Sequence, residues 1–359
     1  DTDRSRGLGD VYKRQVYISN SVWFSTETIS QIVFSLVYIV GAYALHPMAS
    51  FGVLLAMGTY ASKFWQPIVN LANIYNKFID AMAYLERIFE TMNEPPVIED
   101  CPGAVELPPI TGKVEFDHVS FGYEPGQKIL HDVSFTAQPG ESIAIVGPTG
   151  AGKTTIVNLI SRFYNIEEGA VLIDGHSVMD VTLHSLRSQM GIMLQDSFVF
   201  SGTIADNIRY GRLDASDADI VRVSKLLCAD EFIQKLPHGY ETEVKERGGG
   251  LSQGQKQLIA FARTLLADPK ILVLDEATSS IDTSTEQLLQ RGINLLLKGR
   301  TSFIIAHRLS TIRSCTRIMY IDGGQIKEAG SHDELMAKKG YYYDLYMAQY
   351  REDPEDASP

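Results

Sequence analysis

The sequence predicts an α/β domain with a mainly parallel sheet, preceded by an all-α hairpin of two membrane-spanning helices. Two patterns predict the α/β domain. A glycine-rich stretch, residues 147–155, lies between an apolar run and a helical pattern, and a second apolar run ends in the carboxylates Asp275 and Glu276. Strands that alternate with helices form parallel sheets. The apolar character of residues 16–94 predicts the helices that come first.

Composition limits the classes of partner. The chain has 359 residues, enough for two domains, and a formal net charge of −12. A nucleic-acid partner is not expected, because phosphate neutralisation needs a basic face. The three cysteines, Cys101, Cys228 and Cys315, are far apart and lack metal-ligand spacing, so we expect no disulfide framework, no structural zinc and a reducing cytosolic face.

Residues 1–15 are polar and lack the apolar core of a signal peptide. Residues 10–15 resemble the translation of one reading frame of a common sequencing adapter. We interpret the segment as an assembly artefact, so the natural protein is expected to continue upstream of Val16; a natural cytoplasmic loop is the alternative.

Residues 16–94 are expected to form the last two helices of a membrane domain. Residues 29–45 carry no formal charge, and a second apolar run covers about residues 49–69. Each approaches the length of about 20 residues that crosses a bilayer, and Pro47 lies in the short turn between them. Lys63 is expected near an interface, where its side chain can reach water, or facing a water-filled cavity. Residues 68–89 are expected to continue as an amphipathic rod in water. A buried soluble helix pair is the alternative.

Prolines mark a linker at residues 95–109, which separates this region from an α/β domain at residues 110–350. Helical patterns follow two glycine-containing motifs, at residues 156–163 and 256–266. Apolar runs predict the strands: 114–120, 129–137, 141–146, 171–173, 191–194, 271–274, 301–305 and 317–321.

Residues 147–155 have the composition of a phosphate cradle. Glycines at 147, 150 and 152 allow several backbone N–H groups to point at one anion, and the following helix N-terminus adds partial positive charge. Lys153 is placed to reach the β- and γ-phosphates of a nucleotide, and the Thr154 hydroxyl to hold Mg²⁺.

Asp275 and Glu276 end a strand expected to be fully buried, at the sheet edge where parallel folds bind ligands. Asp275 suits Mg²⁺, and Glu276 is placed to polarise an attacking water. Capping of the next helix is the alternative reading of this acidic pair.

Ser252 begins a second helix with an anion-binding N-terminus. One nucleotide has one γ-phosphate, yet the chain offers two sites for it. We therefore expect two subunits that face each other head to tail, each closing the nucleotide site of the other.

These motifs, in this order, resemble the nucleotide-binding domain of ATP-binding cassette (ABC) transporters, over residues 110–350: Tyr123, residues 147–155, Gln195, residues 251–255, Asp275 with Glu276, Asp282 and His307. The resemblance implies a P-loop NTPase domain with added antiparallel β-strands and a helical subdomain. Residues 16–94 resemble the last two membrane helices of an exporter half-transporter, and residues 242–248 resemble an exporter-specific loop.

The resemblance also implies roles. Tyr123 would stack on adenine, Gln195 would sense metal and water, Asp282 would organise the dimer seam, and His307 would contact the γ-phosphate. The implied catalytic residues are Glu276, His307, Lys153 and Gln195, and the implied metal ligands are Thr154, Gln195 and Asp275. The implied nucleotide contacts are Tyr123, Gly147, Pro148, Thr149, Gly150, Ala151, Gly152, Lys153, Thr154, Thr155, Ser252, Gly254, Gln255 and Asp282, where Ser252 and Gly254 touch the ATP of the opposite subunit.

Gln253 departs from the family pattern, which has glycine there, so the potency of the composite site is open, as is the choice between a homodimer and a heterodimer.

The resemblance implies an ATPase that uses ATP and Mg²⁺ to export hydrophobic or amphipathic compounds across a bacterial cytoplasmic membrane, with a second half-transporter and lipid as partners. A soluble ABC-type ATPase in DNA repair or translation, and a regulatory subunit without turnover, are the alternatives. Residues 331–334 fit a capping box, and residues 351–359 are expected to be disordered.

Overall fold

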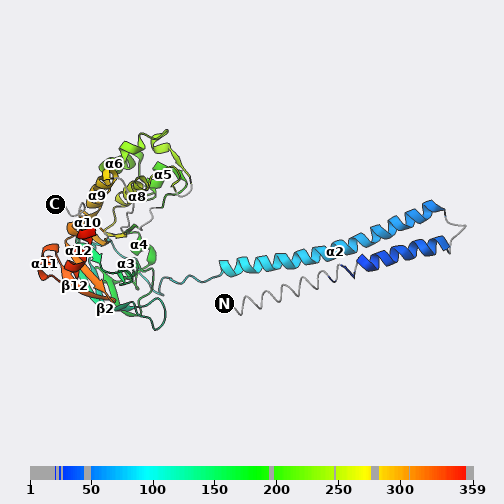
Figure 1. The fold of residues 1–359 in the computed structure, drawn as a ribbon, viewed down its shortest axis with the longest axis horizontal. Coiled ribbons are helices and arrows are strands. Elements are labelled where there is room, and N and C mark those ends of the chain that lie inside the picture. Colours follow the sequence, from blue (N-terminus) through cyan, green and yellow to red (C-terminus); the bar gives the residue numbers. More distant parts are fainter. Residues whose placement is uncertain are drawn as a thin grey trace. The chain divides into compact units, whose positions relative to one another are not determined.

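The computed structural model describes residues 21, 24, 25, 27–43, 50–193, 198–245, 248–275, 283–306 and 308–352. The chain divides into two compact units, Asp1–Pro96 and Val97–Pro359 (Figure 1), and each is described by itself.

The first unit is helical, as expected. Residues 27–43 are helical, and α2 (Phe51–Met92) runs for 42 residues without interruption at Pro67. Two glycines bring these helices together, because a Cβ at Gly41 would lie 2.3 Å from Leu54 Cδ2 and one at Gly58 would lie 2.2 Å from Tyr38 Oη. The predicted turn at residues 46–48 lies outside the described residues.

No helix in the described part of the chain combines the length and the apolarity that a membrane span needs. In α2 the apolar run that begins at Phe51 meets Lys63, Gln66 and Pro67 after little more than three turns. Beyond Pro67 the helix continues as the predicted rod, with exposed apolar side chains along it, among them Leu71, Tyr75 and Phe78.

The second unit is built on a six-stranded sheet. Its strand order is β12 (Gln325–Gly330), β11 (Arg317–Asp322), β3 (Ser142–Val146), β10 (Thr301–Ile305), β9 (Ile271–Asp275) and β6 (Met190–Met193). Every neighbouring pair is parallel except β11 with β12. The prediction of a mainly parallel sheet is therefore confirmed.

Antiparallel strands form a second sheet, in the order β2 (Leu130–Ala137), β1 (Val114–Phe121), β4 (Glu168–Ile173) and β5 (His176–Ser177). A third, two-stranded sheet pairs β7 (Gly202–Thr203) with β8 (Glu243–Val244). The eight predicted strands are all present, whereas β5, β7, β8 and β12 were not expected.

The helices of the second unit have the following bounds, in chain order: α3 (Lys153–Ile160), α4 (Leu183–Arg187), α5 (Ile204–Arg209), α6 (Asp217–Leu226), α7 (Asp230–Ile233), the 3₁₀ turn η1 (Gly239–Glu241), α8 (Gln253–Ala267), α9 (Thr283–Leu297), α10 (Leu309–Ser314), α11 (His332–Lys338) and α12 (Tyr341–Glu352). Figure 1 shows α5, α6 and α8 grouped at one end of this unit, away from β2 and β12.

The alternation of side chains along the parallel strands divides the core in two. Ile143 and Ile145 of β3 pack with the antiparallel sheet and α3, whereas Ala144 and Val146 pack with the helices on the other face. All five β3 residues are buried. The sheet is thus apolar on both faces, as expected of parallel strands that are covered on each side.

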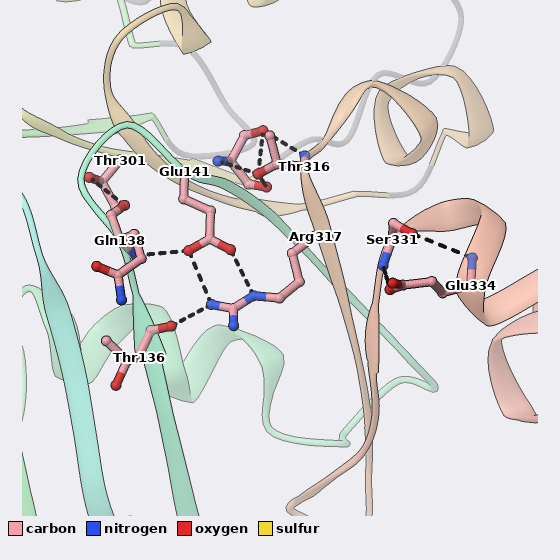
Figure 2. Close-up of polar contacts among 9 residues, drawn as sticks. Thr136, Gln138, Glu141, Thr301, Thr316, Arg317, Ser331 and Glu334 are labelled. Atoms are coloured by element: carbon pink, nitrogen blue, oxygen red, sulfur yellow. Dashed lines mark hydrogen bonds and ion pairs between the residues drawn. The ribbon is translucent and has the colours of Figure 1, made fainter.

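A polar network closes the sheet edge where β3 and β11 begin (Figure 2). Glu141 pairs with Arg317, with Oε1 2.9 Å from Nε, and Glu141 Oε2 accepts the backbone N–H of Gln138 at 2.8 Å. Figure 2 also shows the predicted capping box of α11, in which Ser331 Oγ accepts from the N–H of Glu334 and the Glu334 carboxylate accepts from the N–H of Ser331.

Residues 97–110 contain no helix, and they pack as a strap against the rest of the second unit. Leu107 and Ile110 are buried, and the Gln189 side chain binds the strap backbone on both sides. Its Oε1 accepts the N–H of Ile110 at 2.9 Å, and its Nε2 donates to the carbonyls of Leu107 and Pro108 at 3.3 and 3.1 Å.

Arg162, the second residue after α3, holds the start of this strap. It is fully buried, and its guanidinium donates to the carbonyls of Val181 and Glu99 at 3.1 and 2.8 Å. The strap is therefore part of the second unit's fold.

Candidate functional site

Three strands bring the predicted site residues to one edge of the sheet. Ile305, the last residue of β10, is paired with Ile145 of β3 on one side and Asp275 of β9 on the other. The loop after β3 and the carboxylate at the end of β9 therefore flank the end of β10. This carboxyl edge is where ligands bind in parallel sheets.

The loop after β3 depends on glycine at two positions. Gly147 has φ +141°, and a Cβ there would lie 2.0 Å from the carbonyl oxygen of Ile321. Gly152 has φ +100° and lies at the N-cap of α3, where a Cβ would lie 2.7 Å from Leu130 Cδ2. Because Gly152 has no side chain to cap α3, the first N–H groups of this helix are left to bind an anion.

Lys153 folds back over this loop. Its Nζ donates to the carbonyls of Gly147 and Pro148, both at 2.8 Å. Partial burial lowers the pKa of Lys153, and the negative charge of Asp275 acts in the opposite direction. The cradle, its lysine and the strand-end carboxylate are thus gathered in one place, as the sequence predicts.

Tyr123 lies beside α3, the helix that follows the glycine-rich loop. Its hydroxyl is 3.1 Å from Thr155 Oγ1, and Asn158 Nδ2 donates to it at 3.4 Å. Its ring meets those of Phe121 and Tyr164 edge to face, with centroids 5.2 and 4.8 Å apart, and the residue is 44% exposed. An exposed, immobilised ring near the cradle leaves a surface on which a base could stack.

Ser252 is the N-cap of α8. Its Oγ accepts from the N–H of Gln255 at 3.3 Å, and Gln255 Oε1 accepts from the N–H of Ser252 at 2.9 Å. Gln253 is exposed in the first turn, whereas Gly254 is buried. The hydrogen bonds described for Ser252 and Gln255 hold the start of α8 and involve no residue of the cradle.

Four predicted site residues, Gln195, Glu276, Asp282 and His307, lie outside the described residues, as do Glu246 and Arg247 of the predicted exporter loop. The structure describes the chain that flanks them: Met193 at the end of β6, Asp275 at the end of β9 with Thr283 at the start of α9, and Ala306 with Arg308.

Two further residues near the site were not singled out from the sequence. Arg308 Nη1 forms an ion pair with Glu286 Oε1 on α9, and both side chains are largely shielded from solvent. The signal that could have found Arg308 is its position next to His307. Nothing in the spacing of Glu286 indicates its partner.

A nucleotide-bound Mg²⁺ fits the chemistry of the residues present. This ion prefers oxygen ligands and usually takes one or two from the protein and others from phosphates and water. The exposed Thr154 on the first turn of α3 and the partly exposed Asp275 offer a hydroxyl and a carboxylate. Within the described ranges, no group of three or more His, Cys, Asp or Glu side chains could hold a metal by itself.

Known proteins are similar to this chain over the region that carries these motifs. Residues 130–279 match the family model described as "ABC transporter". The chain is 52% identical over 299 residues to an uncharacterized ABC transporter ATP-binding protein of Bacillus subtilis, YknV, covering 83% of this chain and 50% of that protein. It is 46% identical over 334 residues to a fatty acid ABC transporter ATP-binding/permease protein of Mycobacterium bovis, covering 92% and 52%.

Two further similarities concern exporters. The chain is 42% identical over 302 residues to an ATP-dependent lipid A-core flippase of Syntrophus aciditrophicus, covering 84% of this chain and 50% of that protein. The structure of a bacterial Atm1-family ABC exporter with ATP bound is similar at a TM-score of 0.74 and 38% identity, covering 92% of this chain and 59% of that chain.

The chain spans about half the length of the curated relatives it matches. The matched region contains the glycine-rich loop, Lys153, Asp275 and the α8 N-terminus. On these grounds the chain belongs to the ABC transporter family and carries its ATP-binding domain after a helical segment.

Proposed function

We propose that this chain is the ATP-hydrolysing part of an ABC exporter that moves hydrophobic or amphipathic compounds across the cytoplasmic membrane of a bacterium. The observation that carries the proposal is the arrangement at the carboxyl edge of the sheet, where Lys153 closes the glycine-rich loop within reach of the charge of Asp275. Similarity to proteins named as fatty acid and lipid A-core transporters supports a lipid-like or drug-like cargo.

Phosphate binding follows from the loop. The ammonium of Lys153 now donates to two loop carbonyls, and the β- and γ-phosphates would replace them as acceptors of a charge-assisted bond. The amides of residues 147–155 would supply the remaining donors, with Tyr123 beneath the adenine ring. Thr154, Asp275 and Gln195 would hold Mg²⁺, which neutralises developing phosphate charge when bound.

Hydrolysis is assigned to the residues that follow the strands. Glu276 would orient and deprotonate the attacking water, a role that typically contributes about 10²- to 10⁴-fold in rate. His307 would donate to the γ-phosphate, and Gln195 would report its presence to the membrane helices. Each of these three follows a strand of the six-stranded sheet by one to two residues.

A second subunit completes the site in this proposal. Ser252, Gly254 and Gln255 begin α8, whose N-terminus would contact the γ-phosphate of the opposite chain, and Asp282 would line the seam between the chains. The partner is a second half-transporter, identical or different. The exposed apolar side chains of α2 would face lipid or the remaining membrane helices, and no nucleic acid is involved.

The test compares ATP binding with ATP hydrolysis in the full chain carrying Glu276→Gln. We expect affinity for ATP within about threefold of wild type and kcat lowered at least about 100-fold, because the amide cannot accept the water proton. The same variant should accumulate as an ATP-bound dimer in size-exclusion chromatography.

Glu231→Gln on α7 is the matched control, since Glu231 is an exposed carboxylate on a short helix outside the proposed site. It should leave ATP binding and turnover unchanged. Unaltered turnover in Glu276→Gln would remove the general-base assignment. ATP hydrolysis by a chain that partitions wholly into detergent-free buffer, with no lipid association, would favour a soluble ABC-type ATPase.

A further inference from the structure

Three aromatic side chains meet beside α3. Phe121 and Tyr123 come from the end of β1 and the segment that follows it, whereas Tyr164 follows α3 by four residues. The centroid of the Tyr164 ring lies 4.8 Å from that of Tyr123 and 5.7 Å from that of Phe121. Phe121 and Tyr123 are 5.2 Å apart in the same measure. Each ring therefore contacts the other two.

The two neighbours of Tyr123 are held in different ways. Phe121 is buried and pairs with Leu130 of the adjacent strand, so the sheet fixes its position. Tyr164 is 39% exposed and lies outside any helix or strand. The position of Tyr164 therefore depends on how the chain leaves α3.

The end of α3 fixes Tyr164 by a Schellman motif. The N–H of Phe163 donates to the carbonyl of Asn158 at 2.9 Å, and the N–H of Arg162 donates to the carbonyl of Leu159 at 3.1 Å. This motif places a left-handed residue after the helix, usually glycine. Here the residue is Arg162, with φ +48° and a fully buried side chain. The chain thus turns sharply, and Tyr164 follows two residues later.

The hydroxyl of Tyr123 is anchored on α3 itself. Its oxygen is 3.1 Å from Thr155 Oγ1, and Asn158 Nδ2 donates to it at 3.4 Å. The hydroxyl oxygen lies on the axis about which the ring rotates, so these contacts leave the ring free to turn about χ2, a torsion with broad minima. Only contacts with the ring itself can set the direction of its face, and Phe121 and Tyr164 make such contacts.

We propose that Tyr164 is a positioning residue, which together with Phe121 holds the face of Tyr123 in the orientation that a nucleotide base can stack on. Tyr164 touches no atom of the nucleotide in this scheme. The inference rests on the proposed function, because it takes Tyr123 as the surface beneath the base, and it extends base recognition to a second tyrosine.

The experiment measures the binding of MgADP and of magnesium pyrophosphate to the full chain carrying Tyr164→Ala, by calorimetry. ADP has a base and pyrophosphate has none, and neither carries the γ-phosphate that the proposed reaction removes. We expect affinity for ADP to fall about fivefold, because the ring spends less time in the orientation that a base can use, and affinity for pyrophosphate to stay within about twofold. KM for MgATP should rise by a similar factor, about fivefold, at nearly unchanged kcat.

Phe163→Ala is the matched control. Phe163 directly precedes Tyr164 and is also 39% exposed, but its ring centroid lies 5.1 Å from the guanidinium carbon of Arg187. This variant should bind ADP and pyrophosphate as the wild type does. Tyr164→Phe keeps the ring and should stay within about twofold of wild type for both ligands.

A double variant, Tyr123→Ala with Tyr164→Ala, separates positioning from a general loss of structure. It should bind ADP no more weakly than Tyr123→Ala alone, because Tyr164 acts through Tyr123. Additive losses would overturn the inference, as would equal losses of ADP and pyrophosphate affinity in Tyr164→Ala. Wild-type ADP affinity in Tyr164→Ala beside a weakened Tyr123→Ala would overturn it too, and would leave the proposed function standing. Wild-type ADP affinity in Tyr123→Ala would contradict the proposed base site and the inference with it.

Discussion

At the scale of single residues, the Glu141–Arg317 pair shows how polar groups are accommodated at the edge opposite the site. Glu141 accepts the N–H of Gln138 in addition to its pair with Arg317, and Arg317 Nη2 also donates to the carbonyl of Thr136 (Figure 2). Both side chains are mostly shielded. Glu141 and Arg317 compensate each other's charge, so removing one leaves the other with only its backbone partner.

Arg317→Met should therefore lower the free energy of unfolding by about 2–4 kcal/mol, because Glu141 is left charged and poorly solvated. Chemical denaturation measures this change. ATP affinity should not change, since the pair lies at the amino end of β3 and the glycine-rich loop follows its carboxyl end.

The matched control is Glu168→Gln, which breaks the exposed pair of Lys128 and Glu168, 2.6 Å apart. An exposed pair contributes at most about 1 kcal/mol, so this variant should be close to wild type. If Arg317→Met and Glu168→Gln lowered the free energy of unfolding equally, burial of the ion pair would not determine how much its loss destabilises the fold.

At the scale of elements, the strap at residues 97–110 depends strongly on one side chain. Gln189 uses both ends of its amide to bind Leu107, Pro108 and Ile110. Leucine has a similar size but can neither donate nor accept. Gln189→Leu should leave three backbone groups unpaired and cost about 1–3 kcal/mol locally.

Hydrogen exchange measures this directly, with faster exchange expected over residues 105–111 and little change at the glycine-rich loop. Gln234→Leu on α7 is the control, because Gln234 is exposed and bonds to Asp230 of the same helix at 3.4 Å. If exchange over residues 105–111 were the same in both variants, the Gln189 amide would not be what holds this part of the strap.

The strap and strand β12 also show where prediction from sequence ends. Central strands such as β9 and β10 were predicted to within one residue, because strands buried on both faces give continuous apolar runs. Strand β12 lies at a sheet edge with alternating exposed residues and was missed. The prolines of the strap predict an irregular segment, but its attachment to Gln189 joins residues about eighty positions apart.

The candidate site also has a part that the sequence predicts and a part that it does not. The glycine-rich loop can be predicted because its glycines adopt positive φ angles that other residues rarely adopt. The structure places this loop and Lys153 with Asp275, as expected. The pair of Glu286 and Arg308 depends on the packing of two helices, which no local pattern encodes. The roles of Gln195, Glu276, Asp282 and His307 stay predictions, since these residues lie outside the described chain.

At the scale of the whole molecule, the central question is whether one chain can complete its own site. The loop at Lys153 and Ser252 each lie at the N-terminus of a helix, α3 and α8, and helix N-termini favour anions. In the proposed head-to-tail dimer, each nucleotide uses the loop of one chain and the α8 N-terminus of the other. A defect in the loop and a defect at Ser252 should then complement each other when they are carried by different chains.

The last prediction follows from this geometry. Lys153→Ala and Ser252→Arg should each abolish ATP hydrolysis alone, the first by loss of phosphate binding and the second by a bulky charge at the α8 N-terminus. An equal mixture should form heterodimers in half of its molecules, each with one intact composite site, so about a quarter of wild-type turnover should return. Turnover is measured per chain, before and after the two variants are mixed and allowed to exchange subunits.

A chain that carries both substitutions, mixed with wild type in the same way, is the control, since its heterodimers contain no intact composite site: each site would lack either its lysine or its serine. Recovery in the first mixture and none beyond the wild-type homodimers in the second would place the two halves of the site on different chains, whereas an inactive first mixture would mean that each chain completes a site of its own.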